Sequence, residues 1–202
     1  MKGVERASAL RWLHGQLTDE LVVAGLGNPS YDLLNAGDRP QHFYMWGAMG
    51  CAPSVGLGVA LAAPDATVIA MEGDGGVLMN LGALSTIGWT APSNLVVIVW
   101  DNGILDLTGG QGTATGAGTD LAAVARACGV ALSRRISTMA EFQEGVTEAL
   151  DASGPWCLIV DTAPTPPTRR KPVVALRRRF VRLDDFIDAA IASRRADAGA
   201  GS

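Results

Sequence analysis

Apolar residues recur along the chain in two patterns. Short runs that are apolar at nearly every position are typical of parallel strands with both faces buried, and they occur at 21–24, 67–71, 95–100 and 156–161, with a further short strand at 131–136. Between these runs apolar residues recur every three or four positions, which predicts helices at 4–17, 50–63, 78–89, 120–128 and 138–150, and an amphipathic terminal helix from Asp184. This alternation predicts an α/β fold in three layers, with a mostly parallel sheet flanked by helices.

The ends of several elements carry recognisable signals. Thr119 is the expected N-cap of the 120–128 helix, and Thr138 with Glu141 forms a capping-box pattern at the start of the next helix. A Pro-, Thr- and Arg-rich stretch at 163–172 predicts an extended arm. We therefore expect one α/β domain over 1–162, followed by a C-terminal arm and helix over 163–202.

Three polar loops follow predicted strands: Gly25–Ser30, Gly73–Gly76 and Asp101–Gly118. In open parallel sheets, ligands bind beyond the carboxyl ends of the strands. The third loop is also too long for an ordinary connection, which suggests a functional role. These three loops are therefore the predicted site.

Composition narrows the possible functions. The chain has 202 residues, of which 48% are hydrophobic and 18% charged, which suggests a deeply buried sheet, a large subunit interface, or both. The net charge of −4 argues against nucleic-acid binding, which needs a basic surface. No apolar run reaches membrane-spanning length, and the amino terminus lacks the apolar region of a signal peptide. We expect neither nucleic acid nor membrane as a partner.

The cysteines and histidines point to structural roles. Cys51, Cys128 and Cys157 are isolated and odd in number, which is typical of buried thiols in a reducing compartment and predicts a cytoplasmic protein. His14 is expected at the surface of the first helix. His42 is expected to be structural, although its place before an aromatic run could bring it near the site.

The loop at Gly25 does not fit a dinucleotide fingerprint. It begins as GxG, but the third glycine is missing and Pro29 removes a backbone amide that such a loop would use.

The pairing of GDGG with DN carries a stronger signal. Asp74 and Asn102 each follow a predicted parallel strand, so a carboxylate and an amide oxygen can meet at one edge of the sheet. Mg²⁺ prefers such oxygen ligands and accepts the remainder from phosphates. The flanking glycines allow a phosphate group to approach the backbone closely. A magnesium and phosphate site is therefore predicted.

At this point the sequence resembles a known family. Asn102 lies 28 positions after Asp74, and this GDG…DN spacing resembles the cofactor signature of enzymes that use thiamine diphosphate, also called thiamine pyrophosphate. The segments FYMWGAMG, GDGGVLMNLGALSTIGW and DNGILDLTGGQ resemble the sulfopyruvate and phosphonopyruvate decarboxylases, above all their separately encoded β subunit. The resemblance runs from about residue 4 to the Arg-rich segment near 180. It implies the diphosphate-binding (PP-type) domain of the thiamine-diphosphate-binding fold.

The resemblance also implies roles for individual residues. Mg²⁺ would be held by Asp74, the Asn102 side chain and the Ile104 carbonyl. Met49 would support the bent form of the cofactor, and the Gly47 carbonyl would accept a hydrogen bond from its aminopyrimidine; these two carry the catalytic role assigned to this chain. The full implied cofactor-binding set is Gly27, Asn28, Ser30, Gly47, Met49, Gly73, Asp74, Gly75, Gly76, Asn102, Ile104 and Leu105.

The family activates its cofactor with a glutamate on a separate pyrimidine-binding domain, and this chain has no room for one. The resemblance therefore implies a partner α subunit, in an α2β2 or larger assembly, that supplies the glutamate. Phosphonopyruvate-type relatives tend to carry a histidine where this chain has Leu105, which makes the pocket less polar. Arg169, Arg170 and Arg177 could lie over the site as anion anchors or belong to a solvated tail.

The implied activity is non-oxidative decarboxylation of a small 2-oxoacid, of the sulfopyruvate or phosphonopyruvate kind, to an aldehyde. Carboligation of the acetolactate-synthase type remains an alternative, because pocket shape decides the fate of the intermediate. A non-catalytic cofactor-binding subunit is a further alternative, against which the intact Asp74, Asn102 and Met49 argue. An oxidative, ferredoxin-linked β subunit would need cluster-binding cysteine sets, which three isolated cysteines do not provide.

Overall fold

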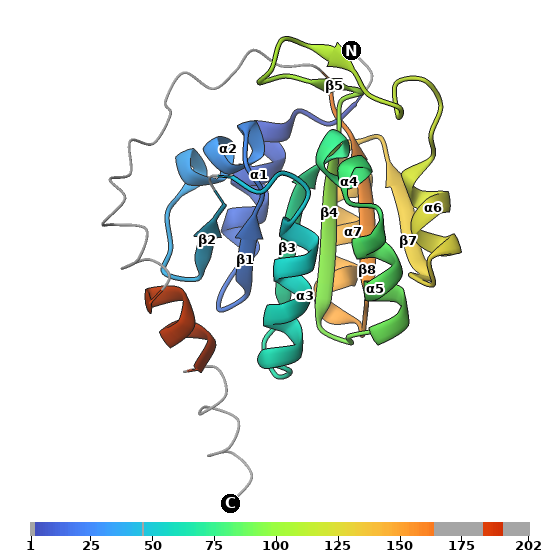
Figure 1. The fold of residues 1–202 in the computed structure, drawn as a ribbon. Coiled ribbons are helices and arrows are strands. Elements are labelled where there is room, and N and C mark those ends of the chain that lie inside the picture. Colours follow the sequence, from blue (N-terminus) through green and yellow to red (C-terminus); the bar gives the residue numbers. More distant parts are fainter. Residues whose placement is uncertain (1–2, 46, 164–183, 192–202) are drawn as a thin grey trace, which may run out of the picture.

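A computed structural model describes residues 3–45, 47–163 and 184–191 of the chain (Figure 1). Its centre is a six-stranded sheet in the order β2-β1-β3-β4-β8-β7, in which every neighbouring pair of strands is parallel. The strands are β1 (Leu21–Ala24), β2 (His42–Tyr44), β3 (Val68–Gly73), β4 (Leu95–Asp101), β7 (Leu132–Ile136) and β8 (Trp156–Asp161). The predicted α/β class and parallel sheet are confirmed.

Helices cover both faces of the sheet, as Figure 1 shows with α3 and α5 in front and α7 behind. One hydrophobic core lies under α3, α4, α5 and α6, and the other lies under α1, α2 and α7. The helices are α1 (Arg6–Gln16), α2 (Asn28–Ala36), α3 (Ala52–Ala62), α4 (Asp74–Met79), α5 (Gly82–Thr90), α6 (Leu121–Ala127) and α7 (Met139–Asp151). A small antiparallel pair, β5 (Ile104–Leu105) and β6 (Gln111–Gly112), lies within the long loop after β4.

Strand β4 illustrates why the central strands are apolar throughout. All seven of its residues are buried, and successive side chains point to opposite faces. Val97 and Val99 join the core under α3 and α5, whereas Val96 and Ile98 join the core under α1 and α7. A polar residue at any of these positions would therefore be buried without water.

Several predicted elements need correction. The loop expected over Gly25–Ser30 ends earlier, because α2 begins at Asn28, and the sequence analysis assigns no element to the positions of β2. The single helix expected at 78–89 is two helices: α4 starts earlier, directly at Asp74, and the chain breaks after Met79. The break follows from Asn80, whose backbone is non-helical and whose side chain donates to the Gly50 carbonyl at 3.1 Å.

The two predicted caps had different outcomes. Thr138 and Glu141 form the capping box of α7, as predicted. Thr119 is not the N-cap of α6: Asp120 is, and its carboxylate accepts from the amides of Ala122 and Ala123. Carboxylates and hydroxyls both make good caps, so sequence alone could not separate the two neighbours.

The C-terminal part is described only over 184–191, which is helical as predicted from Asp184. Phe186 of this helix is buried against the core and lies 5.6 Å from Phe43, measured between ring centroids. The arm expected at 163–172 lies, after residue 163, outside the described residues, as do Arg169, Arg170 and Arg177. Over the described ranges, no helix combines the length and apolar composition that crossing a bilayer requires.

The order of the strands places a ligand crevice. The chain passes from β1 outward to β2, and then returns to the other side of β1 to form β3. Such a reversal opens a crevice at the carboxyl ends of the strands on either side. The loops after β1, β3 and β4 therefore meet at the same edge of the sheet, which is the edge predicted from the sequence.

Candidate functional site

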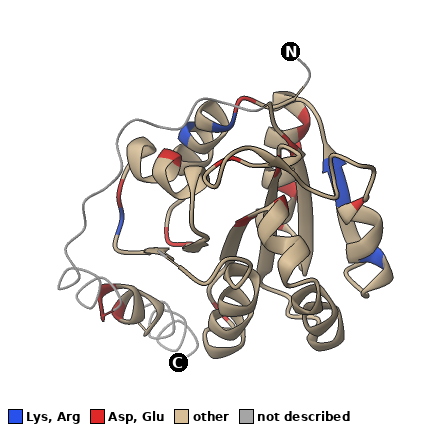
Figure 2. Cartoon of the chain, turned by 45° about the horizontal axis from the view of Figure 1, so that its top comes forward, with Lys and Arg blue, Asp and Glu red and all other residues tan. Residues whose placement is uncertain are grey.

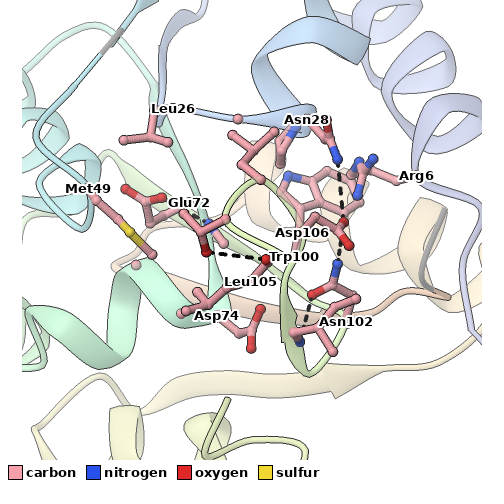
Figure 3. A pocket seen from close by; sticks show the side chains of 18 residues that line it. Arg6, Leu26, Asn28, Met49, Glu72, Asp74, Trp100, Asn102, Leu105 and Asp106 are labelled. Atoms are coloured by element: carbon pink, nitrogen blue, oxygen red, sulfur yellow. Dashed lines mark hydrogen bonds between the residues drawn. The ribbon is translucent and has the colours of Figure 1, made fainter. Parts of the chain in front are cut away.

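One cavity lies at this edge, enclosed by all three predicted loops (Figure 3). It is lined by Arg6, Leu26, Gly27, Asn28, Pro29, Met49, Glu72, Gly73, Asp74, Gly75, Gly76, Trp100, Asn102, Ile104, Leu105, Asp106, Leu107 and Thr108. Ten of the residues proposed from the sequence are therefore brought together: Gly27, Asn28, Met49, Gly73, Asp74, Gly75, Gly76, Asn102, Ile104 and Leu105.

Two proposed residues lie outside this lining. Ser30 is buried, and its hydroxyl donates to the Gly25 carbonyl, so it closes the turn before α2. Gly47 is exposed, and a side chain there would meet nothing within 4 Å.

Asp74 is the first residue of α4 and is only 2% exposed. The hydroxyls of Thr113 and Thr115 contact its Oδ2 at 2.5 and 2.8 Å, and none of the described residues donates a hydrogen bond to its Oδ1. One carboxylate oxygen is thus held by the long loop while the other is left for a further ligand.

The polar network around Asp74 is short of hydrogen atoms. Thr115 Oγ1 lies 2.8 Å from both Asp74 Oδ2 and Asp101 Oδ1, and 2.9 Å from Thr113 Oγ1. A hydroxyl carries a single hydrogen, so the two threonines can make only two of these four contacts as hydrogen bonds at any one time. Burial raises the pKa of Asp101, and the hydrogen bond from Thr115 opposes that rise. Such an oxygen-rich group suits a cation.

Asn102 follows β4 and faces the same cavity. Its Oδ1 accepts from the Ile104 amide at 3.1 Å, and its Nδ2 donates to Asp106 Oδ2 at 2.7 Å. Asn28 Nδ2 reaches the same Asp106 oxygen at 3.4 Å, so the three side chains form a row in Figure 3. Asp106 was not proposed from the sequence. An acidic residue four positions after Asn102, within a loop longer than an ordinary connection, was the signal that could have identified it.

Glu72 is a second acid that the sequence analysis missed. It is 3% exposed and accepts from the Gly50 amide at 3.0 Å and from the Gly73 amide at 3.1 Å. Burial raises its pKa, and these backbone hydrogen bonds partly offset the rise. A Cβ on Gly25 or Gly76 would come within 2.7 Å of its carboxyl group, which explains both glycines. An acid ending an otherwise apolar strand was the signal that could have revealed it.

Apolar side chains close the cavity above α4. A Cβ on Gly75 would overlap Leu105 Cδ2 and come within 3.4 Å of Met49 Cε, so Leu105 and Met49 both pack over this glycine. Figure 3 shows Met49 and Leu105 on the side of the cavity nearest α4. The absence of a side chain at Gly75 is therefore what allows the walls to meet the helix.

The charge around the cavity is mainly acidic. In Figure 2, which brings the carboxyl ends of the strands forward, Lys and Arg lie on α1 and around β7, with acidic positions between them. Arg6 is the one basic residue in the described lining, and its Nε pairs with Asp32 Oδ2 at 2.8 Å. Arg135, outside the lining, pairs with Asp101 at 3.2 Å and with Asp161.

These residues fit a divalent cation that carries a diphosphate. Asp74 and Asn102 each offer one oxygen at the ends of adjacent strands, and Gly75 and Gly76 of α4 line the same cavity. Within the described ranges no three His, Cys, Asp or Glu side chains form a metal cluster. A cation here would therefore take its remaining ligands from phosphate oxygens, as Mg²⁺ commonly does.

Comparison with known proteins agrees with this geometry. The family described as thiamine pyrophosphate enzyme, C-terminal TPP binding domain, matches residues 28–160. A phosphonopyruvate decarboxylase of Streptomyces viridochromogenes is 47% identical over 151 residues, which cover 74% of this chain and 38% of that protein. The sulfopyruvate decarboxylase subunit beta of Methanocaldococcus jannaschii is 41% identical over 145 residues, which cover 72% of this chain and 76% of the relative.

Solved structures show the same fold. The benzoylformate decarboxylase of Polynucleobacter necessarius superposes with a TM-score of 0.67 at 17% identity, over 80% of this chain and 34% of that enzyme. The match covers about a third of that chain and about three quarters of the sulfopyruvate decarboxylase β subunit. By the extent of the family match, the chain belongs to the thiamine pyrophosphate enzymes and carries their C-terminal TPP binding domain.

Proposed function

We propose that this chain is the β subunit of a heteromeric lyase that uses thiamine diphosphate and Mg²⁺ to decarboxylate a small 2-oxoacid to an aldehyde without oxidation. The observation that carries the proposal is the convergence of Asp74 and Asn102 on one cavity with a free carboxylate oxygen. The names of the sulfopyruvate and phosphonopyruvate decarboxylases that resemble the chain support the reaction class.

The residues of this chain would share the work as follows. Asp74, Asn102 and the Ile104 carbonyl would hold Mg²⁺, and the amides of Gly75 and Gly76 would donate to the diphosphate, with Gly27 and Asn28 on its other side. When bound, thiamine diphosphate supplies the carbon that adds to the 2-oxoacid and accepts the electrons left by carbon dioxide. Met49 would hold the cofactor in its bent form, and Leu105 would exclude water.

A partner chain would complete the active site. Relatives named subunit beta imply a companion subunit, and the phosphonopyruvate decarboxylases are long enough to hold both halves in one chain. We propose that a pyrimidine-binding α subunit supplies the activating glutamate, in an α2β2 or larger assembly within the cytoplasm. Gly47 is exposed, two residues before Met49, and its carbonyl would meet the aminopyrimidine at that interface.

The cavity favours a substrate without a second strong negative charge. Arg6 is paired with Asp32, and Leu105 and Leu107 are apolar, so the described lining offers little to a phosphonate or sulfonate. Carbon dioxide release from pyruvate and 2-oxobutyrate, compared with release from phosphonopyruvate and sulfopyruvate, tests this preference. Product analysis with an added aldehyde separates decarboxylation from carboligation, which would yield a hydroxyketone in place of the simple aldehyde.

Calorimetric titration of thiamine diphosphate with Mg²⁺ tests the cofactor assignment. We expect metal-dependent binding that strengthens with the partner and is lost in Asp74→Ala, because the cation loses its one carboxylate ligand. The exposed Asp65→Ala is the matched control and should bind like the wild type. Metal-independent binding, or equal binding by Asp74→Ala, would refute the proposed site.

A further inference from the structure

An asparagine that binds a metal must present its oxygen and turn its amino group away. The two ends of an amide are nearly equal in shape, so the orientation is set by the hydrogen bonds at both ends; at the oxygen end, the Ile104 amide donates to Asn102 Oδ1 at 3.1 Å. In this chain Asn102 Nδ2 donates to Asp106 Oδ2 at 2.7 Å. A carboxylate has no hydrogen to donate, so it accepts from the amino end of the amide and cannot pair with the oxygen end.

Asp106 is itself held between two elements. Its Oδ2 also accepts a hydrogen bond from Nδ2 of Asn28, the first residue of α2, at 3.4 Å. Asp106 is half-buried and lines the cavity, so its carboxylate is shielded from bulk water on one side. The hydrogen bonds to Asn102 and Asn28 therefore join the loop after β4 to the start of α2.

The Asp74 carboxylate is oriented in a similar way. Thr113 and Thr115, later in the same loop, hold Asp74 Oδ2 and leave Oδ1 available. Both of the side chains proposed to bind Mg²⁺ are thus oriented by the segment that runs from Asn102 to Thr115. Side chains that orient metal ligands in this way tune metal affinity in many proteins.

We propose that Asp106 is a positioning residue for the metal: it fixes the Asn102 amide so that Oδ1 faces the cation. This inference rests on the proposed function, because it assigns Asp106 a role toward the Mg²⁺ of that site. A carboxylate close to a diphosphate also repels it, and this repulsion acts in the opposite direction. The sign of the change in metal affinity when Asp106 is removed decides between these two roles.

The test is a titration of Mn²⁺, a paramagnetic substitute for Mg²⁺, monitored by electron paramagnetic resonance. Mn²⁺ is added to the full chain in the presence of thiamine diphosphate, once without and once with the partner subunit. Asp106→Ala should weaken Mn²⁺ binding by about 10- to 100-fold, the range typical of lost partners to metal ligands. Asp106→Asn should bind within about threefold of the wild type, since its own amide oxygen can still accept from Asn102 Nδ2. Asp65→Ala is the control.

A double-mutant cycle guards against a merely structural effect. In an Asn102→Ala background, Asp106→Ala should weaken Mn²⁺ binding no further, because the group that Asp106 orients is gone. Thermal unfolding of each metal-free variant shows whether the chain still folds. If Asp106→Ala does not fold, Asp106→Leu replaces it in the titration and should show the same weakened Mn²⁺ binding. Asp106→Asn, which should bind Mn²⁺ nearly as the wild type does, is then the comparison.

The possible results separate the inference from the proposed function. Unchanged or tighter Mn²⁺ binding by Asp106→Ala would overturn the inference, and tighter binding would identify Asp106 as a group that repels the diphosphate. If Asp74→Ala abolishes binding in the same titration, the proposed function stands in either case. If the wild type with its partner binds no Mn²⁺, both the inference and the proposed function fail.

Discussion

At the scale of single residues, the two histidines of the chain pack against each other away from the cavity. The rings of His14 and His42 lie 5.8 Å apart, measured between centroids, and the Nε2 atoms of both are buried with no hydrogen-bond partner among the described residues. His42 is 1% exposed and its Nδ1 lies 3.2 Å from the Tyr44 hydroxyl, so its predicted structural role agrees with its position. His14, expected at the surface, is half-buried, with its ring against Gly37.

This pair should make stability depend on pH. Burial, with smaller contributions from His14 and Arg39, lowers the pKa of His42 from 6.5 to about 3. Between these values the unfolded chain binds a proton that the folded chain does not, so the free energy of unfolding falls as the pH drops below 6.5. From pH 6.5 to pH 5 the loss should be about 2 kcal/mol.

Urea unfolding at pH 7 and pH 5 measures this effect. We expect His42→Gln to lose most of the pH dependence that the wild type shows in this interval. Tyr44→Phe removes the hydroxyl beside Nδ1 but keeps the imidazole, so it should retain the wild-type slope. Equal slopes for the wild type and His42→Gln would mean that other groups cause the dependence.

The same scale shows how far sequence reasoning could identify the site. Asp74 and Asn102 were recognisable because each directly follows an apolar strand and their spacing resembles a family signature. Glu72, Asp106, Thr113 and Thr115 were not, because their roles depend on partners up to 78 positions away along the chain. Contacts of that kind depend on the path of the loop, which no local pattern encodes.

At the scale of elements, the start of α6 provides a test of which residue caps a helix. Asp120 accepts from two amides of the first turn, whereas the Thr119 hydroxyl makes no hydrogen bond within the described residues. Asp120→Ala should therefore lower the free energy of unfolding by about 1 kcal/mol, as the loss of an N-cap typically does. Thr119→Ala should change it by less than about 0.5 kcal/mol.

Thermal or urea denaturation of the two single variants compares these costs directly. Because the two residues are adjacent and both are polar, the comparison controls for position along the chain. A larger cost for Thr119→Ala would restore the assignment made from the sequence. A double variant that costs no more than Asp120→Ala would agree with a single capping residue.

At the scale of the whole molecule, the chain should recognise mainly the diphosphate half of its cofactor. The described cavity offers Asp74, Asn102 and the backbone of α4 to a metal diphosphate, whereas most of the pyrimidine site is assigned to the partner, with Met49 and the Gly47 carbonyl as this chain's share. With Mg²⁺ and the chain alone, thiamine diphosphate and inorganic diphosphate should bind within about threefold of each other, because both use the same contacts.

Addition of the partner should separate the two ligands. The partner adds a second binding surface that contacts thiamine diphosphate but not inorganic diphosphate. The affinity for thiamine diphosphate should therefore rise at least about tenfold relative to the affinity for inorganic diphosphate. Calorimetry with both ligands, with and without the partner, measures this ratio. A large preference for thiamine diphosphate in the absence of the partner would instead place a pyrimidine site on this chain.

The sequence by itself determined the α/β class, five of the six strands of the main sheet, and the pair Asp74 and Asn102 at two strand ends. These features follow from the period of apolar residues and from short motifs, both of which are local along the chain. Only the tertiary structure decided the strand order, the burial of Glu72, and the approach of Asp106 to Asn102 and Asn28. Those depend on where the crossovers place each strand and on how the loop after β4 folds back, which is set by packing between distant segments.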